Sequence, residues 1–164
     1  MRGIAALLGL LVIPSAQARS HVPDAAMNAV RTYSNALVAA DCAGVYALSA
    51  VTRRHPETKE SLCQGMKAWK EMGVYERLRE PTSSLASGVY RMVVVPNSRI
   101  SVDAGRPVIA NGLYVAISGD SGRTWQVIDI ACDQLPKWVQ GLYPPYDGHP
   151  SLSLASVDRF DERN

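Results

Sequence analysis

Residues 113–130 read LYVAISGDSGRTWQVIDI, and this stretch decides the fold. On either side of a short polar turn the sequence is rich in Val, Ile and Tyr, which favour strands. It predicts one strand from Pro107 to Ser118 and another from Thr124 to Ala131. The two strands form a hairpin, so the C-terminal half of the chain belongs to a β-sheet.

The turn of this hairpin fits the Asp-box pattern S-x-D-x-G-x-T-W. Its fixed positions are Ser118, Asp120, Gly122, Thr124 and Trp125. The carboxylate of such a box accepts hydrogen bonds across the turn, the glycine takes a backbone conformation that a side chain disfavours, and the indole packs beneath the hairpin. A single copy cannot build a sialidase-like propeller, which needs at least four blades. We therefore interpret the box as a structural hairpin rather than a sugar site.

Three shorter strands are expected before this hairpin, at Val74–Arg79, Gly88–Val95 and Arg99–Asp103, because Pro, Gly, Asn and Ser divide the β-favouring residues there. Asn111-Gly112 lies within the predicted 107–118 strand. It could form a tight turn between two strands, but these would be short. We therefore expect a bulge that bends one long strand.

The first part of the chain has a helical period instead. Apolar positions recur at intervals of three and four from Pro23 to Ala40, which predicts an amphipathic helix. A shorter helix is expected from Asp41 to Ala50, and a third from His55 to a left-handed cap at Gly73. Helices followed by strands indicate an α+β fold, with three N-terminal helices packed on one face of a curved antiparallel sheet that encloses an apolar cone.

This order of elements resembles the NTF2-like superfamily, the cystatin-like cone fold shared with ketosteroid isomerase and SnoaL-like polyketide cyclases. The resemblance covers roughly residues 22 to 143. It rests on the three helices, the antiparallel meander and a last strand with the pattern W-x-x-x-D, here Trp125 and Asp129, followed by a segment that closes near Pro144. The superfamily contains enzymes, binding proteins and structural modules, so the resemblance implies a fold rather than one activity.

The N-terminus predicts export. Arg2 precedes an apolar run from Ile4 to Ile13, and Ala16-Gln17-Ala18 provides small residues for signal peptidase. An apolar run of about ten residues is too short to span a bilayer of roughly 30 Å. We expect residues 1–18 to be a signal peptide, 19–143 the NTF2-like domain and 144–164 a flexible tail, in a secreted or periplasmic protein.

Cysteine usage agrees with an oxidising compartment. Of the three cysteines, Cys42 and Cys63 fall on neighbouring predicted helices, and we expect them to form a disulfide. Cys132 is then left as a buried thiol. No zinc-binding spacing of Cys or His is present, and we expect neither a metal nor a cofactor.

The charge balance bears on partners. The chain has seventeen Lys and Arg against fifteen Asp and Glu, and removal of Arg2 with the leader leaves it close to neutral. This argues against nucleic acid as an obligatory partner. Six arginines concentrate in the strand half, where they favour a solvated outer sheet face or, as the alternative, docking of an acidic partner: Arg77, Arg79, Arg91, Arg99, Arg106 and Arg123.

Two functions are compatible with these residues. The first is a binding module, without catalysis, for a small apolar ligand or a protein partner; its expected lining residues are Tyr33, Leu37, Tyr90 and Tyr114. The second is an isomerase or lyase that uses Asp129 as a base and a tyrosine such as Tyr33 to stabilise an oxyanion. Two titratable side chains converging in a deep cavity would favour the enzyme, whereas an interior plugged by Trp69, Met66 or Trp125 would favour the binding module. A homodimer through the sheet is a further hypothesis.

Overall fold

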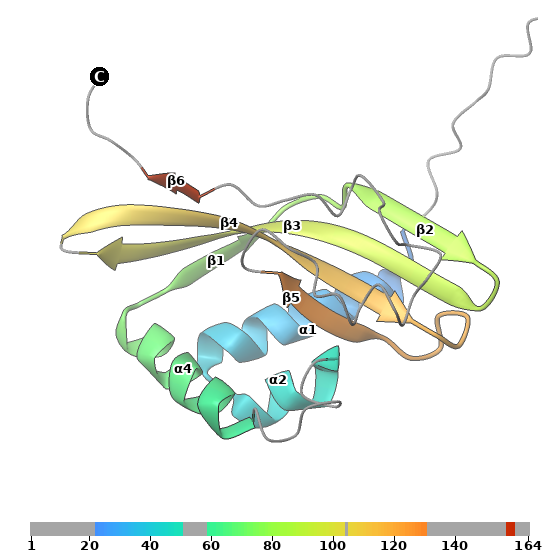
Figure 1. Ribbon diagram of the computed structural model, residues 1–164, viewed down its shortest axis with the longest axis horizontal. Helices are drawn as coiled ribbons and strands as arrows, with labels where there is room; N and C mark the ends of the chain where they lie inside the picture. Colours follow the sequence, from blue (N-terminus) through green and yellow to red (C-terminus); the bar gives the residue numbers. More distant parts are fainter. Residues whose placement is uncertain (1–21, 51–58, 104, 131–156, 160–164) are drawn as a thin grey trace, which may run out of the picture.

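Helices precede strands along most of the chain, and the helices lie together on one side of the sheet (Figure 1). The computed structural model describes residues 22–50, 59–103, 105–130 and 157–159. Within them the helices are α1 (Asp24–Ala39), α2 (Cys42–Leu48) and α4 (Lys59–Glu71). The fold is therefore α+β, as predicted, although the start expected for the third helix lies outside the described residues.

The predicted boundaries of α1 are confirmed to within a residue. Pro23 precedes the first turn, Asp24 supplies a negative charge there, and Ala40 ends the helix in a left-handed conformation with φ 57°. The next helix, α2, is capped by the Asp41 side chain, which accepts a hydrogen bond from Gly44 N at 3.1 Å. A β-carbon on Gly44 would lie 2.6 Å from Asp41 Oδ2, so any other residue here would force the capping side chain to shift.

The sheet is antiparallel and open among the described residues. Its strands are β1 (Tyr75–Leu78), β2 (Ser83–Ser87), β3 (Tyr90–Asp103), β4 (Arg106–Ser118), β5 (Gln126–Ile130) and β6 (Val157–Arg159). The order is β1-β3-β4-β5, with β2 continuing the line of β1 beside β3 and β6 continuing the line of β5 beside β4. The α+β class is thus established, and the sheet formed by the described strands does not close on itself.

One long strand, β3, replaces the two strands predicted around Pro96. The Pro96 carbonyl accepts a hydrogen bond from Arg79 N at 2.9 Å, so the backbone polar groups of this residue face the β1–β2 side. Pairing with β2 ends at Val94 and pairing with β1 begins at Asn97. The missing N–H of Pro96 therefore falls between two edge strands, where the sheet does not need it.

Three further expectations differ from the structure. β3 and β4 pair one to one from Arg91↔Ser118 to Asp103↔Arg106, so the bulge expected at Asn111-Gly112 is absent from that ladder. β2 was not predicted, because its sequence SSLAS has little β-propensity and it forms by pairing with β3. Finally, β6 lies within the predicted flexible tail.

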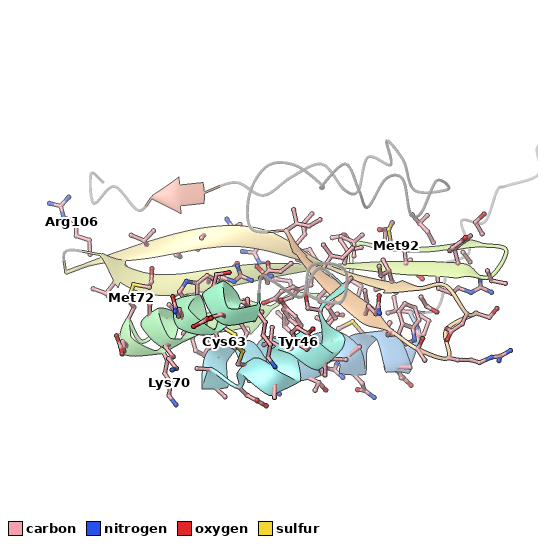
Figure 2. The ribbon with its side chains drawn as sticks, turned by 60° about the horizontal axis from the view of Figure 1, so that its bottom comes forward. Tyr46, Cys63, Lys70, Met72, Met92 and Arg106 are labelled. Atoms are coloured by element: carbon pink, nitrogen blue, oxygen red, sulfur yellow. A yellow bond between two sulfur atoms is a disulfide. The ribbon has the colours of Figure 1, made fainter. Side chains whose placement is uncertain are left out.

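Both faces of the sheet carry apolar residues. The face toward the helices packs with α1 in one cluster that includes Val30, Tyr33, Val93, Tyr114, Trp125 and Val127. A second buried cluster alternates with it along the strands and includes Met92, Val94, Val115, Ile117, Ile128 and Ile130. Figure 2 shows Met92 on the side of the sheet away from the helices. The outer face is therefore partly apolar, and not wholly the solvated, arginine-bearing surface that we expected.

The predicted disulfide is confirmed. It joins Cys42 of α2 to Cys63 of α4, with the two Cα atoms 5.3 Å apart (Figure 2). The Lys59 ammonium, 4.8 Å from the centre of the Tyr46 ring, adds a second contact between the same helices. A disulfide fits an extracellular or periplasmic protein. No helix among the described residues has the length and apolar character needed to cross a membrane. The predicted leader and Cys132 lie outside these residues.

Removal of this disulfide should lower stability. We expect Cys63→Ser to reduce the free energy of unfolding by about 3 kcal/mol, because the bond closes a loop with a sequence separation of 21 residues. Urea unfolding of the exported chain measures this effect, with Cys132→Ser as the control that keeps the bond. Peptide mapping without reduction should return a peptide that joins Cys42 to Cys63, and a peptide that contains Cys132 linked to either of them would contradict the assignment.

Candidate functional site

A row of polar side chains crosses the helix-facing side of the sheet. Four strands contribute one residue each: Glu76 from β1, Arg99 from β3, Tyr114 from β4 and Asp129 from β5. Register brings Glu76 opposite Arg99, and Tyr114 opposite Asp129. We call these four residues the Arg99 cluster.

The guanidinium of Arg99 is shared between two carboxylates. Its Nε donates to Glu76 Oε1 at 2.9 Å, and its Nη2 donates to Asp129 Oδ2 at 2.6 Å. The same Nη2 lies 2.9 Å from Tyr114 Oη, whose hydroxyl donates to Glu76 Oε1 at 2.6 Å. Ser34 Oγ on α1 donates to the other oxygen of Glu76. Both oxygens of Glu76 are therefore occupied by protein donors.

The charged side chains of the cluster are largely buried, which makes the loss of any of these contacts costly. The side chain of Glu76 is 1% exposed, that of Arg99 9% and that of Asp129 18%. A charge in such a position is costly unless it is paired, and removal of one partner leaves the other uncompensated. With two carboxylates and one guanidinium, the fully ionised cluster carries one net negative charge.

Aromatic rings enclose the cluster. The Trp69 ring of α4 lies 4.8 Å from the Arg99 guanidinium, and Tyr33 of α1 meets Tyr114 edge to face at 5.4 Å between ring centres. A pocket of only about 10 Å³ remains beside Trp69, Glu76 and Arg99. That volume is at the lower limit for a single water molecule. The described side chains therefore leave room for about one water molecule in this pocket.

Electrostatics set the protonation of the cluster. Burial raises the pKa of Asp129, although the charge of Arg99 opposes the effect. Burial also raises the pKa of Tyr33 and of Tyr114 well above the ordinary range, so both hydroxyls stay protonated. Burial alone would lower the pKa of Arg99, but Asp129, Tyr114 and Glu76 raise it, and the guanidinium remains charged.

Three buried polar atoms on this side of the sheet have no hydrogen-bond partner in the described part of the chain. They are Asp129 Oδ1 and both polar atoms of the Asn97 side chain. Asn97 lies opposite Gly112, where a β-carbon would come within 2.8 Å of Asn97 Oδ1. Buried atoms without a partner are uncommon and mark places where a ligand, a water molecule or a functional role can be sought.

The residues predicted to line a ligand site are not all brought together. Tyr33, Leu37 and Tyr114 share the helix-facing core, and Asp129 contacts Arg99 beside them. Tyr90, in contrast, packs against the cluster on the opposite face. Tyr90 lies three residues before Val93, which faces the helices. Side chains an odd number of residues apart along a strand point to opposite faces, so Tyr90 cannot line the same space.

Glu76 and Arg99 are the site residues that sequence reasoning missed. Arg99 is separated by even intervals from Val93 and Val95, so strand alternation would have placed it on the buried face if β3 had been recognised as one strand. Glu76 lies two residues before Leu78, which packs against the helix-facing cluster, so the same rule places Glu76 on that face. Arg99 therefore does not lie on the outer face that we expected for the arginines of the strand half.

The Asp-box turn has the geometry that its sequence predicts. Asp120 Oδ1 accepts hydrogen bonds from Arg123 N at 3.0 Å and Thr124 N at 2.9 Å, and Asp120 Oδ2 accepts one from Thr124 Oγ1 at 2.7 Å. These donors lower the pKa of Asp120. Ser118 Oγ accepts from Gly122 N at 2.9 Å, and Gly122 has φ 88°. Trp125 Nε1 donates to Gly122 O at 3.0 Å while its ring joins the core.

Comparisons with known proteins add no relative: neither a protein-family model nor a curated protein sequence matches the chain. Within the described residues, His, Cys, Asp and Glu form no group of three that could hold a metal ion.

The Asp-box tryptophan should be needed for stability. Trp125 is 8% exposed, so Trp125→Ala should lower the free energy of unfolding by about 3–5 kcal/mol. Trp125→Phe is the matched control, because it keeps a ring in the core and loses only the bond to Gly122. Chemical denaturation measures both variants. An alanine variant as stable as the wild type would contradict the structural role.

Asp129 should make stability depend on pH. Its pKa is higher in the folded chain than the ordinary value of about 3.9, so the folded state binds the proton more tightly. The Asp129 contribution to the free energy of unfolding should therefore fall as pH rises from about 4 through the folded pKa, by at most about 1.4 kcal/mol per pH unit.

The substitution Asp129→Asn should remove this decrease of the unfolding free energy with rising pH. We expect the difference in unfolding free energy between wild type and variant to change over that interval, as measured by urea titrations at a series of pH values. Asp24→Asn, an exposed carboxylate on α1, controls for the loss of one acidic group. A difference that is constant across the interval would show that burial does not control Asp129.

Proposed function

We propose that the protein is an exported domain of the NTF2-like type that acts by binding a partner and not by catalysis. The observation that carries this proposal is the small pocket beside Trp69, where the described residues leave about 10 Å³ next to the Arg99 cluster. A ligand pocket for a drug-sized molecule needs roughly 300 Å³ or more. Binding is therefore expected on the outside of the domain, and a protein partner fits this better than a small apolar molecule.

The hydrogen bonds of the cluster support the same conclusion. A general base needs a carboxylate oxygen that can reach a substrate proton. Both oxygens of Glu76 accept bonds from Arg99, Tyr114 or Ser34, and Asp129 Oδ2 is held by Arg99 at 2.6 Å. These bonds favour a structural role, in which the charges fix the position of the strands beneath the helices.

One observation favours a second candidate function. Asp129 Oδ1 and the Asn97 amide are buried and have no partner within the described residues. In an isomerase or lyase of the ketosteroid isomerase or SnoaL type, Asp129 would take a proton next to a carbonyl group. The protonated hydroxyl of Tyr33 or Tyr114 would then stabilise the oxyanion.

A single assay separates the two functions. The exported chain and Asp129→Asn are incubated with a β,γ-unsaturated ketone, and the absorbance of the conjugated product is followed. We expect both proteins to match the rate in buffer alone. Turnover by the wild type that is lost in Asp129→Asn, with the fold intact by circular dichroism, would establish the enzyme in place of the binding module.

Binding itself is tested by cross-linking the exported chain to the secreted or periplasmic proteins of its own producing cells. The cross-linked protein is then purified, and its Kd for the uncross-linked chain is measured. We expect saturable binding that persists in Tyr33→Phe, because the Tyr33 hydroxyl lies in the interior. Failure of every cross-linked protein to bind saturably would contradict the proposal.

A further inference from the structure

An opening larger than the pocket beside Trp69 lies on the outer face of the sheet, on the opposite side from the Arg99 cluster. It is a groove of about 500 Å³ with lining residues on β1, β3 and β4. These strands are neighbours in that order in the sheet (Figure 1). Arg77, Arg79 and Glu80 line it from the first strand and the loop that follows. The remaining lining residues are Leu78 of β1, Ser98 and Ile100 of β3, and Ile109 of β4. We call it the outer groove.

Arg79 is held in position across the groove. Its Nη2 donates to Ser98 Oγ at 2.7 Å and to Asn111 Oδ1 at 3.3 Å, and Ser98 Oγ donates to Asn111 Oδ1 at 2.8 Å. Arg79 is nevertheless exposed. Its guanidinium is therefore oriented by the neighbouring strands while other N–H groups remain accessible to a ligand.

Arg77 adds a second cation on the same side. Register pairs it with Ser98, and an interval of two residues places Arg77 and Arg79 on one face, roughly 7 Å apart along the chain. Within the described residues Arg77 makes no ion pair or hydrogen bond. Two exposed arginines thus face one carboxylate, Glu80, in the lining of the groove.

Apart from Ser98, the rest of the lining is apolar. Ile100 and Ile109 face each other across β3 and β4 and are half-buried. A ligand that fits this groove therefore combines negative charge near β1 with aliphatic surface near β4. An extended peptide has this property when its acidic side chains are two residues apart, because they then repeat at the same distance of roughly 7 Å as Arg77 and Arg79.

We propose that the outer groove binds an extended acidic segment of a protein partner, with carboxylates two residues apart on Arg77 and Arg79 and an aliphatic side chain on Ile100 and Ile109. This inference rests on the proposed binding function and names the chemistry of the partner. The charge of the groove and the spacing of the two arginines carry it.

Fluorescence anisotropy with a designed probe tests the inference. The probe is a labelled nine-residue peptide in which Val and Glu alternate, and the comparison peptide has Gln in place of every Glu. We expect the Glu peptide to bind at least about tenfold more tightly, which corresponds to about 1.4 kcal/mol. Two exposed ion pairs are sufficient for such a difference. The affinity should fall as NaCl is raised from about 50 to about 500 mM.

Variants locate the binding site. Arg77→Gln and Arg79→Gln should each weaken binding of the Glu peptide by about threefold, which corresponds to about 0.7 kcal/mol. Arg123→Gln, in the Asp-box turn, removes the same charge outside the groove and should leave the affinity unchanged. Arg77→Gln is the decisive variant, because the Arg77 side chain makes no ion pair or hydrogen bond with another described residue, so its loss should not alter the melting temperature.

Four outcomes would overturn the inference. The first is equal binding of the Glu and Gln peptides, and the second is an equal effect of Arg77→Gln and Arg123→Gln. The third is displacement of the peptide by vesicles of phosphatidylglycerol but not of phosphatidylcholine, which would assign the groove to an anionic lipid surface. A cross-linked partner that binds Arg77→Gln as tightly as wild type would also reject the groove, yet it would leave the proposed binding function in place.

Discussion

The buried guanidinium of Arg99 constrains the rest of the structure. It lies among apolar side chains, so it needs both Glu76 and Asp129 within 3 Å, and these residues come from β1 and β5 at the two ends of the strand order. A shift of either strand by one residue would turn its carboxylate to the other face and leave a buried charge unpaired. The cluster therefore specifies the register of β1, β3, β4 and β5, and Trp69 and Ser34 extend this constraint to the helices.

The parts of the fold that could be predicted depend on short-range patterns. The apolar stripe of α1, the hydrogen bonds of the Asp-box turn and the disulfide each follow from residues within about twenty positions of one another. β2 and the unbroken β3 could not be predicted in this way, because they depend on which strand lies alongside. Pro96 is a strand breaker by sequence, and only the gap between β1 and β2 makes it harmless.

The candidate site was predictable only in part for the same reason. Tyr114 and Asp129 belong to the hairpin that decides the fold, and their proximity follows from its register. Arg99 lies 15 positions before Tyr114 and Glu76 lies 38 positions before it, so their contacts depend on the full sheet. An arginine side chain is usually exposed to solvent, so an arginine in a strand is expected on the outer face. The energy of pairing with two carboxylates overrides that preference here.

The burial of the cluster also changes how the charge of the chain should be interpreted. The predicted mature chain has sixteen basic and fifteen acidic residues, which suggests no preference for a charged partner. The cluster removes one basic and two acidic residues from that balance, so fifteen basic and thirteen acidic residues remain outside it. A nearly neutral sequence can therefore present a cationic groove, because two of its carboxylates, Glu76 and Asp129, are buried in the ion pairs with Arg99 beneath the helices.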